Sequence, residues 1–563
     1  MNDSVATLPA AGPPRDASLP SPVERVLDNG LRVVAFSQRN LPLIAAQLVV
    51  RCGGAAEHED EAGLAALVAA LLTQGTTGRS AVELAATSDA LGARLDAGSG
   101  YDATVIGVSA TTPAFPHAFA LLDEVVREPA FTPREVERVR TKSISDLALT
   151  YANPSAVARL VAQRVAYGAS PYGHPLAGTA ATLAALGRDR VAWFHERFYR
   201  PDDAVLVIGG DLTVDDAFAL AQREFGDWRA PQTPMDDRPH GAFPPPRARV
   251  VVVDKADAGR TALIAGRVTI ARRSPDYYAA VVAAAVLNGY SGRLNQAIRV
   301  QRGLSYGAGA SLSPRRMPGL FIASTLVDHA RAVEATQVTM QTIRSLADAP
   351  ATEEELATRK ATVTGGFYRS VETIDGIAGA LAEHVLYDVP LDELQRYAPS
   401  VQAIAAKTVC DFAVRGLVDD DFIVLVGDAA RFADELGRTY GDVQTIRSLA
   451  DAPATEEELA TRKATVTGGF YRSVETFDGI AGAIAEHVLY DVPLDELQRY
   501  APSVQAIAAK TVCDFAVRGL VDDDFIVLVG DASRFADELG RTYRDVQTIS
   551  GDALELGSPS LER

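Results

Sequence analysis

The chain has 563 residues, of which 73 are acidic and 54 basic, so its formal net charge is −19. Hydrophobic residues make up 47% and charged residues 23%, which excludes a disordered, collagen-like or disulfide-framework protein. The acidic balance argues against nucleic acid or an anionic membrane surface as a partner.

The first 22 residues are rich in Pro and Ala and predict a disordered tail, followed by a first domain over residues 23–229. Runs of β-branched residues predict strands over 31–38, 43–53, 104–110 and 204–211. Apolar periodicity predicts helices over 63–72, 81–91, 116–126 and 214–225. A long helix is expected after Thr132, because Thr132 can cap it and Pro133 suits its first position.

Six prolines between residues 230 and 246 predict an extended linker to a second domain over 247–443. There the same signals predict strands over 260–270, 304–314, 319–327 and 421–428. Helices are expected over 276–287 and 352–368, and after residue 428. The sequence therefore predicts an α+β protein with two similar domains, each with an antiparallel sheet and helices.

A long tandem duplication inflates the length of the chain. Residues 444–546, copy two, repeat residues 341–443, copy one, at an offset of 103. The copies differ only at the pairs Ile374/Phe477, Leu381/Ile484, Ala430/Ser533 and Gly441/Arg544. Solenoid repeats are shorter and more divergent, so this is a duplicated half-domain, and removing one copy leaves 460 residues. Residues 547–563 form a final tail.

Copy one is expected to complete the second domain, because it follows that domain's own strands directly. If copy two took this place, the chain would close a loop about 100 residues longer, at a cost of roughly 4 kcal/mol. Copy two is then expected to pack poorly, or to exchange between molecules, since its last strand needs a sheet.

Cysteine content and hydropathy indicate the compartment. With one copy removed only Cys52 and Cys410 remain, too few for a disulfide framework or a CxxC metal site. The beginning of the chain lacks the basic and apolar regions of a secretory signal, and the apolar run at 277–287 is too short to span a membrane. A cytoplasmic location is expected, with a periplasmic one open if the start site is misassigned.

Several segments resemble the pitrilysin/insulinase family of zinc peptidases, which includes mitochondrial processing peptidase and its bacterial relatives. They are LDNGLRVVA (27–35), EAGLAALVAALLTQGTTGRS (61–80), YGHPLAGT (172–179), FYRPDDAVLVIGGDL (198–212) and SGRLNQAIRVQRGLSYGAGA (291–310). They follow the family's order, and the resemblance extends from about residue 23 to residue 440. It implies a clam-shell of two similar domains.

The resemblance also places the family's zinc site on this chain. Family peptidases carry His-x-x-Glu-His on one helix face, where two imidazoles hold zinc and the Glu activates its water. The matching positions here are Ala66, Ala69 and Ala70, and Asp146 stands where a later helix would supply the distal carboxylate. No metal or other cofactor is therefore expected in this chain. The alternative for Asp146 is a solvated helix residue. His174 and His195 stand alone, and a loop contact is expected for His174.

A second family feature is an Arg and a Tyr, seven residues apart, that face the zinc across the chamber. The matching residues are Arg299 and Tyr306. The resemblance implies that they hold substrate and donate to the developing oxyanion, which a guanidinium and a phenol can do. The alternative is that Arg299 is an exposed helix-end cation and Tyr306 a strand residue that packs on the sheet.

Lost zinc ligands and a kept Arg/Tyr pair are the pattern of the second subunit in heterodimeric family members. The resemblance thus implies a non-catalytic subunit without peptidase activity of its own. Its partners would be a zinc-bearing homologue with His-x-x-Glu-His and a peptide substrate. One alternative is a catalytically dead scaffold that binds peptide or protein with no peptidase partner, and another is a defective product of the duplication. An unrelated hydrolase is not favoured, because P-loop and Rossmann motifs are missing.

Overall fold

The computed structural model describes residues 19–168, 170–231, 250–255, 258–418, 421–441 and 443–447, and the single residues 499 and 502. The elements below belong to one compact unit, residues 1–448. Most of the tail at 1–22, of the linker at 230–246 and of copy two lies outside the described residues, as does the whole tail at 547–563. The expectation that copy two packs poorly therefore stays a prediction.

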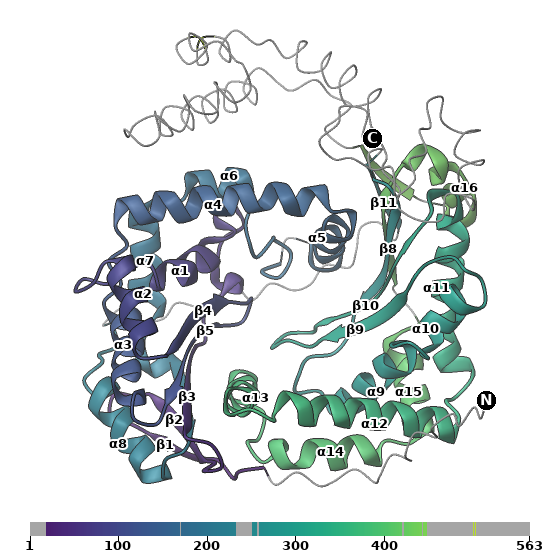
Figure 1. Ribbon diagram of the computed structural model, residues 1–563. Coiled ribbons are helices and arrows are strands. Elements are labelled where there is room, and N and C mark those ends of the chain that lie inside the picture. Colours follow the sequence, from purple (N-terminus) through teal and green to yellow (C-terminus); the bar gives the residue numbers. More distant parts are fainter. Residues whose placement is uncertain are drawn as a thin grey trace, which may run out of the picture. The chain divides into compact units, whose positions relative to one another are not determined.

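The first half of the unit is built on a six-stranded sheet in the order β1-β2-β6-β3-β5-β4 (Figure 1). Its strands are β1 (Val23–Val26), β2 (Arg32–Ser37), β3 (Leu43–Val50), β4 (Arg94–Ser99), β5 (Thr104–Thr111) and β6 (Ala204–Gly210). The sequence predicted four of them. It missed β1, whose four residues are all exposed, and β4, whose RLDAGS sequence carries few of the residues that favour strands.

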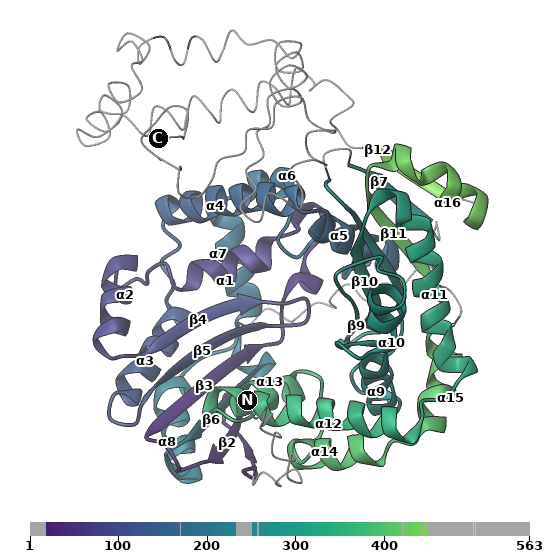
Figure 2. The same ribbon diagram turned by 45° about the vertical axis from the view of Figure 1, so that its right-hand side comes forward.

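The second half repeats this plan with a sheet in the order β12-β7-β11-β8-β10-β9 (Figure 2). Its strands are β7 (Val250–Asp254), β8 (Thr261–Val268), β9 (Ala308–Ser313), β10 (Leu320–Val327), β11 (Phe422–Gly427) and β12 (Val443–Arg447). The last strand of copy one, β11, lies between β7 and β8 and thus completes the middle of this sheet. Copy one occupies the place that the sequence analysis assigned to it.

The prediction of antiparallel sheets is wrong, because both sheets are mixed. Strand β6 is parallel to β2 and antiparallel to β3, and β11 is parallel to β7 and antiparallel to β8. The reason is geometric. Each of these strands returns late in the chain and enters between two strands of opposite direction, so it must run parallel to one of them.

Helices surround the two sheets. Those of the first half are α1 (Leu64–Leu72), α2 (Ala81–Ala90), α3 (Phe115–Arg127), α4 (Pro133–Ala152), α5 (Pro154–Tyr167), α6 (Ala180–Ala185), α7 (Arg188–Phe198) and α8 (Val214–Phe225). Those of the second half are α9 (Tyr277–Leu287), α10 (Arg293–Asn295), α11 (Ala332–Asp348), α12 (Glu353–Ser370), α13 (Ile374–Leu386), α14 (Glu393–Ala403), α15 (Ala406–Gly416) and α16 (Ala433–Tyr440). Thr132 and Thr352 cap α4 and α12 through their hydroxyls, as the sequence predicted for Thr132. No helix in the described part of the chain is long and apolar enough to cross a membrane.

The central strands are buried on both faces, which explains their continuous apolar sequences. In β2, Val33 and Ala35 join the core under the helices of the first half, whereas Val34 and Phe36 face the opposite side. Side chains of a strand alternate between faces, so two cores share one strand. Strand β11 does the same in the second half, with Leu425 in one core and Val424 in another.

Each sheet receives its second cover from the other half of the chain. Helix α13 of the second half packs Ile377, Leu381 and Val385 on β3 and β6 of the first sheet. Helix α5 of the first half packs Ala158 and Ala162 on β8 and β11 of the second sheet (Figure 1). This exchange of helices buries apolar surface from both halves in shared cores, so each half contributes to the stability of the other.

One short sequence adopts two conformations in the structure. The residues Gln-Thr-Ile-Arg lie inside helix α11 at 341–344, and the same four residues form strand β12 at 444–447. Strand β12 pairs with β7 in parallel register, from Val443 opposite Val250 to Arg447 opposite Asp254. The same four residues are helical in one place and extended in the other, so their tertiary surroundings determine the conformation.

Candidate functional site

Helix α1 carries the three alanines that the sequence analysis placed at zinc-ligand positions. Ala66 is half-buried, Ala69 is buried and Ala70 is exposed, so the face formed by positions 66 and 70 is partly open to solvent. A methyl group offers no electron pair to a metal, and these three positions cannot hold zinc. In the described chain, no group of three or more His, Cys, Asp or Glu side chains is placed to bind a metal ion.

The beginning of α1 is held by Glu57, a residue that the sequence analysis did not select. The Glu57 carboxylate accepts hydrogen bonds from the backbone N–H groups of Gly63, at 3.0 Å, and of Ala65. Its side chain is fully buried, and burial raises the pKa of Glu57 above the usual range of a glutamate. His174 lies beside it, with Nε2 at 3.2 Å from Glu57 Oε2. The loop contact expected for His174 is therefore a contact with Glu57, the residue that holds the beginning of α1.

Asp146 lies on α4 and forms an ion pair with Lys142 one turn earlier, at 2.6 Å. Its side chain is 57% exposed, as in a solvated helix residue. His195 is also engaged elsewhere: its Nε2 lies 2.7 Å from the carbonyl oxygen of Val126, and burial lowers its pKa to about 4. Neither residue is assembled with α1 into a ligand set in the described structure.

Arg299 lies on a π-helical turn, η4 (Gln296–Val300), and its side chain is exposed. Its guanidinium lies 5.1 Å from the centre of the Tyr290 ring, a cation–π contact. The described residues offer it no ion pair or side-chain hydrogen bond. Single π-turns are rare and occur often at functional sites.

Tyr306 is 78% exposed and lies before β9 rather than in it, which corrects the strand predicted over 304–314. The ladder begins late because the Ser305 hydroxyl donates to the carbonyl of Leu326, at 2.8 Å, and thereby takes the place of a strand contact. The Arg260 guanidinium lies 4.9 Å from the Tyr306 ring centre. Tyr306 does not pack on the sheet, so the alternative is wrong for Tyr306. Arg299 is an exposed cation at the end of a helical turn, as the same alternative expected.

Backbone hydrogen bonds bring the chain back on itself between Arg299 and Tyr306. The N–H of Gly303 donates to the carbonyl of Arg299 at 3.0 Å, and that of Leu304 to the carbonyl of Ile298 at 2.9 Å. Gly303 has a φ of +59°, a conformation that favours glycine at this turn. The two exposed side chains therefore flank one tightly closed turn.

Comparison with known proteins identifies the fold and the family. The insulinase family, peptidase family M16, matches residues 32–180, and the peptidase M16 inactive domain matches residues 185–363. The chain belongs to peptidase family M16. Both M16 matches end before copy two, so they apply to the described unit.

Curated relatives of this M16 chain include an uncharacterized zinc protease of Mycobacterium tuberculosis. It is 28% identical over 372 residues, which are 65% of this chain and 84% of the relative. The mitochondrial-processing peptidase subunit alpha of Neurospora crassa is 24% identical over 219 residues, 38% of this chain and 37% of that protein.

Two solved structures share the M16 fold. The peptidase M16 inactive domain from Pseudomonas fluorescens has a TM-score of 0.66 and 23% identity, and the match covers 72% of this chain and 98% of that one. A protease from Helicobacter pylori has a TM-score of 0.68 and 18% identity, and the match covers 73% and 100%.

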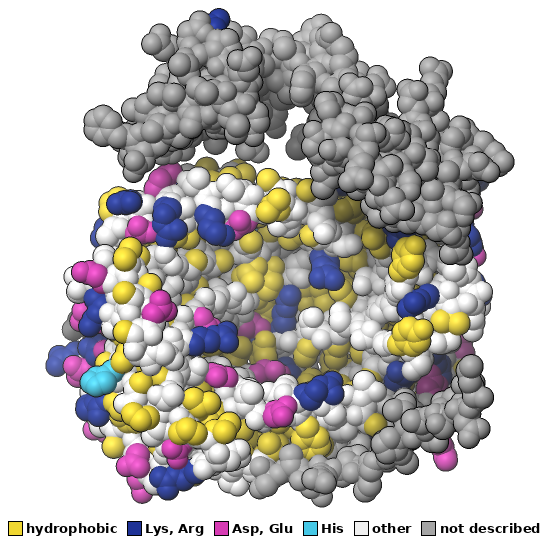
Figure 3. Space-filling model, in the orientation of Figure 1, with side chains coloured by type: hydrophobic (Ala, Val, Ile, Leu, Met, Phe, Trp, Pro, Cys, Tyr) yellow, Lys and Arg dark blue, Asp and Glu magenta, His cyan; other side chains and the backbone are white. Residues whose placement is uncertain are grey.

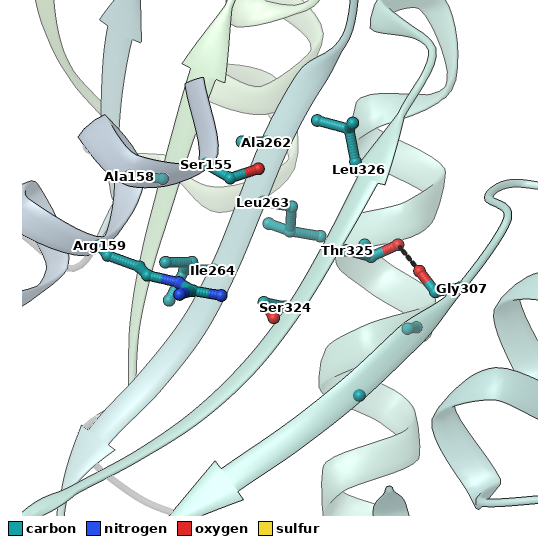
Figure 4. Close-up of a pocket in the computed structure, with 12 residues that line it drawn as sticks. Ser155, Ala158, Arg159, Ala262, Leu263, Ile264, Gly307, Ser324, Thr325 and Leu326 are labelled. Atoms are coloured by element: carbon teal, nitrogen blue, oxygen red, sulfur yellow. Dashed lines mark hydrogen bonds between the residues drawn. The ribbon is translucent and has the colours of Figure 1, made fainter. Parts of the chain in front are cut away.

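A cavity of about 230 Å³ begins next to Tyr306 in this M16 unit, at Gly307 (Figure 4). Helix α5 contributes Ser155 and Arg159 to it, and β8, β9 and β10 form the other walls. The carbonyl of Gly307 accepts a hydrogen bond from the Thr325 hydroxyl at 2.9 Å, which ties the loop of Tyr306 to β10. Sequence reasoning missed Arg159, because only the packing of α5 on the other half's sheet brings it here.

The surface around the two halves carries charges of both signs. Figure 3 shows Lys, Arg, Asp and Glu side chains intermixed over the visible face, which is hollowed at its centre with basic side chains inside the hollow. The formal charge of −19 is therefore not gathered on this face.

Proposed function

We propose that the chain is the non-catalytic subunit of a heterodimeric zinc metallopeptidase and supplies Arg299 and Tyr306 to a partner's active site. The observation that carries the proposal is that both side chains are exposed beside one closed turn. Among the described residues they form only contacts with aromatic rings or with Arg260, so their donor groups are available to a peptide carbonyl.

The alanines on α1 support the same assignment of zinc binding to a partner subunit. Ala66, Ala69 and Ala70 provide neither imidazole nor carboxylate, so zinc and the general base would come from a partner that carries His-x-x-Glu-His. A guanidinium and a phenol in a chamber that excludes water can stabilise an oxyanion without reorganisation. A relative named as one subunit of a processing peptidase is consistent with a member that works in an assembly.

The test is a reconstitution with a His-x-x-Glu-His homologue from the same genome. We expect the purified chain alone to contain no stoichiometric zinc by mass spectrometry and to leave peptides intact, and the mixture to cleave them. Arg299→Ala should lower kcat/KM of the mixture about a hundredfold. Arg302→Ala is the matched control, since the Arg302 guanidinium already donates to the Ala297 carbonyl at 3.0 Å.

Two results would refute this function. Tight zinc in the chain alone would show that it has a metal site of its own, and unchanged turnover with Arg299→Ala would remove the role given to Arg299. Peptide binding by the chain with no gain of cleavage from any such homologue would favour the alternative, a catalytically dead scaffold.

A further inference from the structure

A second cavity, of about 450 Å³, lies in the second half among α12, α13, α14 and the beginning of α9. It shares no lining residue with the cavity beside Tyr306. Its volume falls in the range of sites for small molecules, and the proposed peptidase function does not use it.

The cluster of Arg272, Glu383 and Glu393 beside this cavity carries one negative charge in excess. The buried guanidinium of Arg272 donates from Nε to Glu383 at 2.9 Å and from Nη2 to Glu393 at 2.8 Å. Two carboxylates therefore share one cation. Glu393 is largely buried, whereas the Glu383 side chain is 49% exposed and lines the cavity. Arg272 also lines the cavity but its side chain is only 3% exposed, so a ligand would meet the more exposed Glu383 carboxylate, which favours a cation.

Aromatic rings form other walls of the cavity. Tyr277, Phe367 and Tyr397 line it, and the rings of Phe367 and Tyr397 stack with their centres 4.3 Å apart. The Arg272 guanidinium already lies 3.8 Å from the centre of the Tyr277 ring. Ring faces attract cations, and a carboxylate next to several rings is a typical arrangement for binding organic ammonium groups.

His384 supplies a polar group that the protein does not satisfy. It lines the cavity and is only 3% exposed, and its Nδ1 has no hydrogen-bond partner in the described structure. Burial lowers the pKa of His384, which favours the neutral ring. Buried polar atoms are almost always paired in folded proteins, so this nitrogen is available to a ligand.

Two glycines line the cavity at positions where neighbouring atoms would leave room for a larger side chain. A Cβ at Gly366 in α12 would meet nothing nearer than Arg369 Nη2 at 3.9 Å, and one at Gly379 in α13 nothing nearer than Gln47 at 3.6 Å. Both distances are ordinary contacts. Glycine is unfavourable inside a helix, yet both residues line the cavity, and larger side chains there would enter it.

We propose that this cavity binds a small organic cation whose ammonium or guanidinium group pairs with Glu383, packs on the aromatic rings and donates a hydrogen bond to His384 Nδ1. The cation is either a free small molecule or the basic side chain of a peptide. Arg272 and Tyr277 precede the duplication, whereas Glu383 and His384 recur in copy two as Glu486 and His487. Each full-length chain therefore has one complete site.

Calorimetric titration of the full-length chain tests the proposal with agmatine as the free cation and a short, blocked arginine peptide as the other source. We expect saturable binding of at least one probe, with one site per chain. Glu383→Gln should weaken it at least about tenfold, because it removes the carboxylate that pairs with the ligand's positive charge. Gly366→Leu should abolish it by filling the cavity, and circular dichroism shows whether each variant is folded.

Glu372→Gln is the matched control, since Glu372 is an exposed carboxylate between α12 and α13 that does not line the cavity. The chain is titrated without any peptidase partner, so failure of this proposal and failure of the peptidase role are separate. No binding of either probe at millimolar concentration, tighter binding of glutamate than of agmatine, two sites per chain, or an undiminished affinity in Glu383→Gln would each overturn it.

Discussion

The imidazole Nε2 of His174 lies 3.2 Å from Glu57 Oε2, although the two residues are far apart in sequence. Both side chains are buried, and the same carboxylate caps the first turn of α1. Through this pair, the loop that carries the YGHPLAG segment holds the helix on which family peptidases place their zinc ligands. In this chain the Glu57 carboxylate holds the beginning of α1, and the three positions that the sequence analysis matched to zinc ligands are alanines.

Removal of the Glu57 carboxylate should destabilise the protein strongly. Glu57→Ala leaves two backbone N–H groups without their acceptor and removes the carboxylate beside a buried imidazole, so we expect the free energy of unfolding to fall by about 3 kcal/mol. Urea unfolding measures it. Glu59→Ala is the control, because Glu59 forms an exposed ion pair with Arg164 worth less than about 1 kcal/mol. Equal losses in the two variants would contradict the role of Glu57.

The buried imidazole of His195 should make stability depend on pH. Its pKa is lowered from 6.5 to about 4, so between these values the unfolded chain binds a proton that the folded chain does not. The free energy of unfolding should therefore decrease as pH falls from 6.5 to 4, by about 2 kcal/mol after allowance for partial exposure.

Denaturant unfolding at a series of pH values checks this slope. His195→Asn should reduce it, because the buried imidazole no longer titrates. His117→Asn should leave the slope as it is, because His117 is exposed. A steep slope that persists in His195→Asn would assign the pH dependence to another residue.

The Tyr306 hydroxyl should contribute to turnover rather than to binding. In the reconstituted peptidase, Tyr306→Phe keeps the ring beside Arg260 but loses one donor, so kcat should fall about 10- to 100-fold with little change in KM. Tyr290→Phe is the control, because only the ring of Tyr290 contacts Arg299. A rise in KM at constant kcat would mean that the Tyr306 hydroxyl binds the ground state.

Deletion of residues 444–546 should leave the described fold intact. The deletion joins Val443 to Gln547, and the new sequence Val-Gln-Thr-Ile-Ser differs from β12 only in its last residue. We expect the 460-residue chain to keep the melting temperature of the full chain within a few degrees, by calorimetry. A large loss of stability would show that copy two supports the unit.

A chain that stops at Gly441 is the counterpart of this deletion. It lacks β12 and exposes the edge of β7, which β12 otherwise pairs along its whole length. Bare edges promote association between sheets. We expect a lower melting temperature and concentration-dependent aggregation, followed by light scattering.

Local signals in the sequence predicted local structure well. The Thr132 cap and the apolar runs of β2, β3, β6 and β11 have the expected positions, because capping and burial act on neighbouring residues. The sequence predicted a strand at Tyr306 because the flanking residues suit one. In the structure the Ser305 hydroxyl donates to the carbonyl of Leu326, 21 residues away, and β9 begins only at Ala308.

The relations that build the candidate sites were beyond sequence reasoning, since they depend on contacts between distant segments. No periodic pattern in the sequence indicates these contacts. Examples are Glu57 with His174, Arg272 with Glu383, and α5 with the sheet of the other half. Arg299 and Tyr306 were found only through the family resemblance. Their exposure is now described, whereas their function stays a proposal.

The duplication begins at a sequence, Gln-Thr-Ile-Arg, that fits both a helix and a strand. The triplet Gln-Thr-Ile occurs at 341–343, at 444–446 and again at 547–549. In the 460-residue chain without copy two, the triplet would occur twice, 103 residues apart. An unequal crossover between those two triplets would add 103 residues and leave every earlier residue unchanged, including β12 up to Ile446. The joint between Val443 and Gln444 lies inside β12 and does not interrupt its pairing with β7. The same crossover in reverse would restore the shorter protein.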